Sequence, residues 1–333
     1  MSKKAKIIEV LEAAGKLYFY LYEYDNKQKN ILTRGIDLLF CKDISFLDKV
    51  LIVYAWLTKM DSKRVKQAQK AYFNAYNYRK RMVLRRIFDC FGFSGFVSLP
   101  FSEDNPDPDE AIRCFFSISN EIFYSNIYKL DKLLDDNDVI IDGGANIGLF
   151  SLYAKSLKEN VSCLVFEPEV RNFQALEKNL RDYENIKLFK EGLSDKVSEG
   201  RLLISTAHGA HKLDSKLLDF SLCYDYYGSQ KVKLNTIDNV VFSTNTKVDL
   251  IKLDIEGAEL LALRGGVKTI PKYSPLLLVA AEHTRQQALE IIKFFRRNFR
   301  NYSFIRLNKE NVLFYDPRKH LGRVKRLQDE SGS

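Results

Sequence analysis

The second half of the chain alternates short apolar runs with amphipathic stretches. Five apolar runs end in polar or glycine-rich turns: DVIIDGG, SCLVFEP, NIKLFKEG, VDLIKLDIEG and PLLLVAAEH. Between most of them apolar residues recur every three or four positions, as in EVRNFQALEKNLRDY, which predicts helices. Continuous apolar strands separated by helices are typical of a parallel sheet covered on both faces. We therefore expect a doubly wound α/β domain that binds its ligand at the carboxyl ends of the strands.

Two parts of the chain depart from this rhythm. Residues 193–247 add the strand-like runs GRLLIS and QKVKLN and a polar excursion. The first 110 residues are predicted to be mainly helical, and they end in PFSEDNPDPDE, whose three prolines and five acids indicate a surface linker. We therefore predict a mainly helical region of unassigned role at 1–110, the α/β domain at 111–317 and a basic polar tail at 318–333.

Composition narrows the class of protein. The 333 residues are 46% hydrophobic, enough for a sizeable core. The five cysteines lie at least 24 residues apart, which indicates neither a disulfide framework nor a zinc ribbon and favours a reducing, cytoplasmic location. The apolar run at 50–58 is too short to cross a bilayer, and Glu9 and Glu12 interrupt any signal peptide, so no transmembrane segment is expected.

The run VIIDGGANIGLFS, residues 139–151, has the glycines of a nucleotide-binding turn. A dinucleotide fingerprint fits only with Ala145 in place of the middle glycine, and a P-loop is excluded because no Lys-Ser or Lys-Thr follows. A second register, D-x-G-x-N-x-G, runs through Asp142, Gly144, Asn146 and Gly148. This register suits S-adenosylmethionine, because a strand-end acid and bare backbone N–H groups match the ammonium and carboxylate of its methionine end. A tight turn without a ligand is the structural alternative.

Glu167 is the next acid, at the end of the second predicted strand. A carboxylate there can accept hydrogen bonds from both ribose hydroxyls of an adenosine, whether the cofactor is a dinucleotide or S-adenosylmethionine. The alternative is an acid that caps the following helix.

A family resemblance rests on six segments in order: IIDGGANIGLFS, FEPE, KEGLSDK, KLNTIDNV, DLIKLDIEGAELLALRGG and LLLVAAEH. Residues 138–283 resemble the FkbM family of S-adenosylmethionine-dependent methyltransferases. The resemblance implies a class I methyltransferase fold, Rossmann-like, with a seven-stranded, mostly parallel sheet and helices on both faces. It also implies that Asp142, Gly144, Asn146 and Gly148 hold the methionine end of the cofactor, Glu167 its ribose, and Glu191 and Leu193 its adenine. Gly143 and Gly192 depart from the family's more usual valine and alanine.

Strand ends also supply candidates for the chemistry. Asp254 ends the fourth strand and Glu282 and His283 end the fifth, so each can orient an acceptor hydroxyl or take its proton. Glu256 is a further candidate on the turn, although it and Glu259 also suit a helix N-terminus. His208 and His211 have a spacing that can join one metal, but no third ligand is evident and no metal is expected.

These features predict a methyltransferase that transfers a methyl group from S-adenosylmethionine to a hydroxyl of a saccharide or other small metabolite. The substrate class comes from the family resemblance. The formal charge of +9 is concentrated in the basic segment 63–86, which leaves nucleic acid, as in an RNA methyltransferase, as an alternative partner. A non-catalytic binding module and an NAD-dependent enzyme are two further hypotheses that the sequence leaves open.

Overall fold

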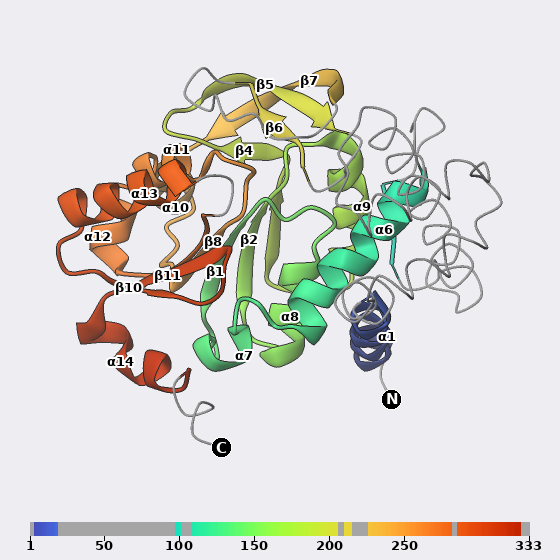
Figure 1. Cartoon of the computed structure of the whole chain (residues 1–333), viewed down its shortest axis with the longest axis horizontal. Helices are drawn as coiled ribbons and strands as arrows, with labels where there is room; N and C mark the ends of the chain where they lie inside the picture. Colours follow the sequence, from blue (N-terminus) through green and yellow to red (C-terminus); the bar gives the residue numbers. More distant parts are fainter. Residues whose placement is uncertain are drawn as a thin grey trace, which may run out of the picture.

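The computed structural model describes residues 3–18, 97–100, 108–205, 210–214, 226–281 and 285–327. Its centre is a seven-stranded sheet (Figure 1). The strands, in order across the sheet, are β10 (Ser303–Arg306), β11 (Asn311–Tyr315), β9 (Leu276–Ala280), β8 (Leu250–Leu253), β1 (Val139–Gly143), β2 (Ser162–Phe166) and β3 (Ile186–Phe189). The strands from β9 to β3 are parallel, and only β11 and β10 at one edge pair antiparallel. The expected doubly wound, mostly parallel sheet of the class I methyltransferase fold is confirmed.

Alternate residues of each central strand enter two separate cores. Ile140 of β1 belongs to one core and the adjacent Ile141 to the other, as expected from the two-residue period of a strand. Because both faces are buried, these strands are continuous apolar runs in the sequence.

Helices cover both faces (Figure 1). The first face is covered by α1 (Lys3–Tyr18), α6 (Pro108–Ser119), the π-helix η3 (Asn120–Tyr124), α7 (Leu130–Leu133), α8 (Leu149–Leu157), α9 (Val170–Leu180) and α14 (Pro317–Lys325). The second face is covered by α10 (Ile237–Ser243), α11 (Glu259–Arg264), α12 (Thr269–Tyr273) and α13 (Arg285–Asn298). The turns that follow the parallel strands meet at one edge of the sheet, at the carboxyl ends of the strands.

A second, four-stranded sheet lies at that edge. It contains β4 (Glu191–Leu193), β7 (Tyr226–Asn235), β5 (Ser198–Ser205) and β6 (Lys212–Leu213), in that order. Its apolar face packs on Ala258 and Leu261, which follow β8. The strand-like runs predicted in residues 193–247 are thus confirmed, and they form a separate layer rather than an extension of the central sheet.

Helices α1 and α14, near the two ends of the chain, each contribute buried residues to the first core. Leu11 and Ala14 of α1 are buried there, and Val324 of α14 is buried on the same face. Residues 318–325, expected in a polar tail, lie in α14, where Arg323 pairs with the buried Asp138. The basic segment 63–86 lies outside the described residues, and the division of the chain at 110 and 317 stays a prediction. None of the described helices is long and apolar enough to cross a membrane.

Candidate functional site

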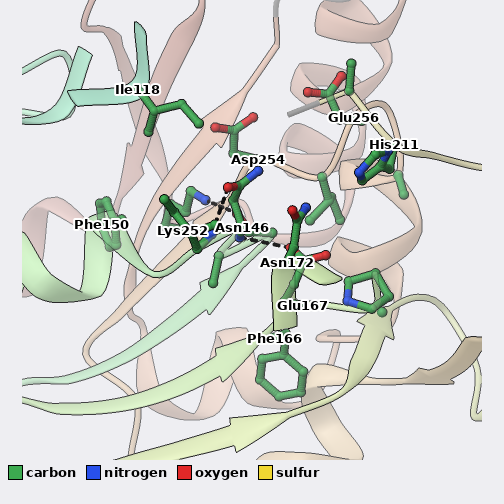
Figure 2. A pocket seen from close by; sticks show the side chains of 18 of the residues that line it. Ile118, Asn146, Phe150, Phe166, Glu167, Asn172, His211, Lys252, Asp254 and Glu256 are labelled. Atoms are coloured by element: carbon green, nitrogen blue, oxygen red, sulfur yellow. Dashed lines mark hydrogen bonds between the residues drawn. The ribbon is translucent and has the colours of Figure 1, made fainter. Parts of the chain in front are cut away.

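A pocket of about 380 Å³ opens at the carboxyl edge of β1, β2 and β8 (Figure 2). One wall comes from the turns of the α/β domain: it includes Gly144 to Ile147, Glu167, Glu191 and Leu193. The opposite wall comes from α6, η3 and the loop after them: it includes Arg113, Ser117, Ile118, Glu121, Ile122 and Tyr128. Asp254 lies between the two walls, and Glu256 lies beside His211 (Figure 2). We call these the turn wall and the helix wall.

The glycine turn is closed by its own hydrogen bonds. The N–H groups of Gly144 and Ala145 both donate to Phe166 O, at 3.1 and 3.0 Å. Asn146 N donates to Glu167 Oε2 at 2.9 Å, and the next two N–H groups, at 147 and 148, donate to Asn146 Oδ1 and Ala145 O. The bare backbone donors expected from the sequence are therefore already engaged.

Position 144 requires a glycine because the backbone after β8 passes very close to it. Its φ is +73°, and a Cβ there would lie 1.9 Å from the carbonyl oxygen of Asp254. Only glycine tolerates both the left-handed conformation and this contact. The β1 turn and the β8 turn therefore touch through bare backbone, which brings Asp254 to the pocket.

Asp142 stabilises the glycine turn through buried side-chain contacts. Its carboxylate is fully buried, accepts a hydrogen bond from Ser151 Oγ at 2.7 Å, and lies 3.3 Å from Lys252 Nζ. Asp142 and Gly148, predicted to contact the cofactor, are not among the described residues that line the pocket. Their contact with a cofactor stays a prediction, and the partners of Asp142 make it a support for the turn.

Lys252 is the other half of that support. Its ammonium group donates to Gly143 O at 3.1 Å and to Gly144 O at 2.8 Å, and its third neighbour is Asp142. The ammonium group thus makes two hydrogen bonds to carbonyl oxygens and an ion pair with the Asp142 carboxylate. Lys252 is 3% exposed, so this charge is buried and compensated inside the turn wall.

Glu167 and Glu169 have different roles although they are two residues apart. Glu167 lines the pocket and accepts hydrogen bonds from Asn146 N and Glu169 N, both at 2.9 Å. Burial raises the pKa of Glu167 to about 8, against the lowering effect of those two donors. Glu169 is the N-cap of α9 and accepts from the N–H groups of Arg171 and Asn172. The capping alternative therefore describes Glu169, whereas Glu167 lines the pocket and its contact with a ribose stays a prediction.

Glu191 and Leu193 lie just past β3, as predicted, on β4. Both line the pocket, and Glu191 Oε2 accepts a hydrogen bond from Asn235 Nδ2 at 2.7 Å. Leu193 also contacts the glycine turn, since a Cβ on Gly143 would lie 3.0 Å from Leu193 Cδ1. The departure from valine at Gly143 fits this lack of space.

Asp254 is paired with a buried tyrosine. Tyr128 Oη donates to Asp254 Oδ2 at 2.7 Å, and the Tyr128 ring packs edge-on against Phe150. Burial, together with the negative charge of Asp254, raises the pKa of Tyr128 well above its usual value, so the hydroxyl keeps its proton and stays a donor. Asp254 itself is half-buried and lines the pocket.

The turn after Asp254 is fixed by Glu259. Its Oε1 accepts from Ile255 N at 2.9 Å and from Gly257 N at 3.3 Å, and its Oε2 accepts from Gln287. Glu259 thus has the helix N-terminal role anticipated for it. Glu256 lies between those donors with φ +54°, and its side chain reaches the pocket near His211 (Figure 2).

The histidines and the end of the fifth strand are described only in part. His208, Glu282 and His283 lie outside the described residues, so their roles stay predictions. His211 lines the pocket, and its Nδ1 accepts from Ser205 N at 3.2 Å. Within the described ranges no group of three or more His, Cys, Asp or Glu side chains is placed to hold a metal ion.

Sequence reasoning missed Lys252, Tyr128 and the helix wall. A lysine inside the apolar run DLIKLD was a signal, because a buried charge needs partners. Tyr128 had no comparable signal, since its partner is 126 residues away in the chain.

Comparison with known proteins gives consistent matches. The family described as Methyltransferase FkbM domain matches residues 142–304. "Methyltransferase sdnD" of Sordaria araneosa is 30% identical over 186 residues, covering 44% of this chain and 67% of that protein. "Methyltransferase 1" of Beauveria bassiana is 29% identical over 164 residues, covering 44% and 66%. The "AMB antimetabolite synthetase AmbE" of Pseudomonas aeruginosa is 27% identical over 181 residues, only 8% of its length.

A solved structure of methyltransferase FkbM from Methylobacillus flagellatus KT is also similar. It is 16% identical, with 63% of this chain and 56% of that chain covered and a TM-score of 0.42. The chain thus spans little more than half of that protein and a small part of the synthetase. The chain covers two thirds of the 30% identical methyltransferase sdnD, and the family match includes the turn wall. This chain therefore belongs to the FkbM methyltransferase family.

Proposed function

We propose that this methyltransferase uses S-adenosylmethionine and methylates a hydroxyl oxygen on a saccharide or other small metabolite. The observation that carries the proposal is the charge of the pocket. Among the described residues six acidic side chains line it, of which Glu167, with its pKa of about 8, is charged only in mildly alkaline solution: Glu121, Glu167, Glu191, Asp254, Glu256 and Glu310. Among the described lining side chains, those with a full positive charge are Arg113, which pairs with Glu110, and Lys252, which pairs with Asp142.

This charge distribution favours a cationic cofactor over a dinucleotide. S-adenosylmethionine carries a sulfonium and an ammonium group, whereas NAD carries a pyrophosphate that requires donors. The glycine turn offers no such donors, because its N–H groups from 144 to 148 are engaged. Carboxylates in a partly buried pocket attract cations and repel phosphate.

The lining residues divide by the part of the cofactor they suit. Glu167 is a buried acceptor suited to ribose hydroxyls, and Leu193 offers an apolar contact beside it. When bound, S-adenosylmethionine supplies a methyl group on a positively charged sulfur. We assign its ribose to Glu167 and its adenine to the Glu191 and Leu193 side.

Asp254 is the best-placed group to receive an acceptor hydroxyl. Its Oδ2 is bonded to Tyr128, and no other described residue donates to its carboxylate. Its second oxygen can accept a hydrogen bond from the acceptor and take the proton that an attacking hydroxyl must lose. Holding the hydroxyl in line with the transferable methyl is the larger part of the task for such a displacement.

The proposal is tested by titrating the purified protein with S-adenosylmethionine and, separately, with NAD. We expect heat release with S-adenosylmethionine only. Methyl-labelled S-adenosylmethionine is then incubated with the small-molecule fraction of source cells, and the labelled product is identified. A product methylated on oxygen supports the proposal; binding of NAD alone, or label on nitrogen or carbon, contradicts it.

A further inference from the structure

We propose that the helix wall is the acceptor-binding side of the active site and that Tyr128 is a positioning residue, which holds Asp254 toward the acceptor. This inference rests on the proposed function and adds to it the part of the chain that precedes the family match at residue 142. Neither the family match nor the sequence motifs cover this wall.

The position of the wall is the first support. Ser117, Ile118, Glu121 and Ile122 line the pocket opposite the glycine turn. In Figure 2, Ile118 lies across the pocket from Glu167, with Asp254 between them. A molecule that contacts Asp254 from this side lies between the helix wall and the cofactor-binding turns.

The local backbone explains how the wall reaches the pocket. At Asn120 the α-helix α6 becomes the π-helix η3, and such wide turns occur often at functional sites. Ser119 and Asn120 at the junction are buried. Helix α1 packs closely against it: a Cβ on Gly15 would lie 2.5 Å from Ser119 O. The N-terminal helix therefore supports the wall.

Tyr128 connects the helix wall to Asp254, the residue proposed to receive the acceptor hydroxyl. Its hydroxyl makes the 2.7 Å hydrogen bond to Asp254 Oδ2 and its ring is held by Phe150, so both partners have little freedom. With Oδ2 occupied, Oδ1 is the oxygen left for an acceptor. Glu121, which accepts from Ser117 Oγ, is a second carboxylate on the same wall for a hydroxyl-bearing ligand.

The test compares Tyr128→Phe with Tyr153→Phe. Tyr153 is a matched control, because it is also buried, packs edge-on against Phe123 and does not line the pocket. Each protein is titrated with S-adenosylmethionine, and methyl transfer from labelled S-adenosylmethionine is measured over a dilution series of the small-molecule extract fraction. The melting temperature of each variant is measured in parallel.

We expect Tyr128→Phe to lower the maximal transfer rate at least about tenfold, with S-adenosylmethionine affinity and melting temperature close to those of the unmodified protein. Tyr153→Phe keeps the full rate. In an Asp254→Asn background, Tyr128→Phe lowers the rate no further, because the two residues act as a unit. Glu121→Gln raises the extract concentration that gives half the maximal rate.

Several results overturn the inference. One is a full transfer rate in Tyr128→Phe. Another is an equal loss in both tyrosine variants together with a lower melting temperature, which indicates a structural role. A third is an effect of Tyr128→Phe that adds to that of Asp254→Asn. Failure of the unmodified protein to bind S-adenosylmethionine contradicts the proposed function instead, so the two failures are distinguishable.

Discussion

The two walls of the pocket are built in different ways. The turn wall is made of contiguous motifs at strand ends, and backbone hydrogen bonds hold it closed. The helix wall is made of side chains spread over residues 113–128, held by packing against α1 and by the bond from Tyr128 to Asp254. On the proposed function, the shape of the cofactor side of the pocket is fixed mainly by backbone hydrogen bonds, whereas the shape of the acceptor side depends on the packing of side chains.

The largest expected effect is that of Lys252→Met, which removes the support of the turn wall. Asp142 would be left as a buried charge without its cation, and Gly143 O and Gly144 O would lose the hydrogen bonds from the ammonium group, so we expect about 3–5 kcal/mol of lost stability and no measurable cofactor binding. Urea unfolding and calorimetric titration measure both. Lys155→Met is the control, since Lys155 is also buried but donates to Glu159 O and Val161 O, away from the pocket. Equal loss of binding in both variants would contradict the role given to Lys252.

Gly144→Ala tests the contact between the β1 and β8 turns. Its Cβ would clash with Asp254 O, so we expect a loss of about 2–4 kcal/mol and displacement of Asp254 from Tyr128. Gly257→Ala is matched: its φ is +100°, but no atom lies within 4 Å of the added Cβ. Gly257→Ala should lose only the conformational part, about 1–2 kcal/mol. Equal losses in urea unfolding would show that the contact is unimportant.

A third expected effect concerns the pH dependence of stability. Because burial raises the pKa of Glu167 to about 8, the folded protein binds a proton there that the unfolded chain releases near pH 4.5. The contribution of Glu167 to stability is therefore full below pH 4.5 and is lost as the pH rises to about 8, by at most about 1.4 kcal/mol per pH unit. Urea unfolding at several pH values measures the slope, and Glu167→Gln should remove this part of it. An unchanged slope in the variant would contradict the assignment.

The turn wall was predictable from the sequence and the helix wall was not. Glu167, Glu191 and Asp254 follow apolar runs, so the rule that ligands bind at strand ends is enough to place them. The pairing of Asp142 with Lys252 could not be placed this way, because it depends on β8 lying beside β1. Tyr128 reaches Asp254 because its ring packs against Phe150 of α8, a contact that the sequence pattern does not reveal. Local pattern identifies elements and their ends, whereas contacts between distant segments require the tertiary fold.

The central claim is that Glu167 is the cofactor-binding carboxylate of the turn wall. It is tested most directly by titrating S-adenosylmethionine into the unmodified protein, Glu167→Gln and Glu169→Gln at pH 8.5, above the pKa of about 8. Hydrogen bonds to a charged acceptor contribute about 1.5–3 kcal/mol, so Glu167→Gln should bind about 10- to 100-fold more weakly. Glu169→Gln alters the cap of α9 and the pair with Arg171 but no side chain that lines the pocket, so it should bind within about twofold of the unmodified protein. Equal affinity in all three proteins, or a larger loss in Glu169→Gln, would contradict the account.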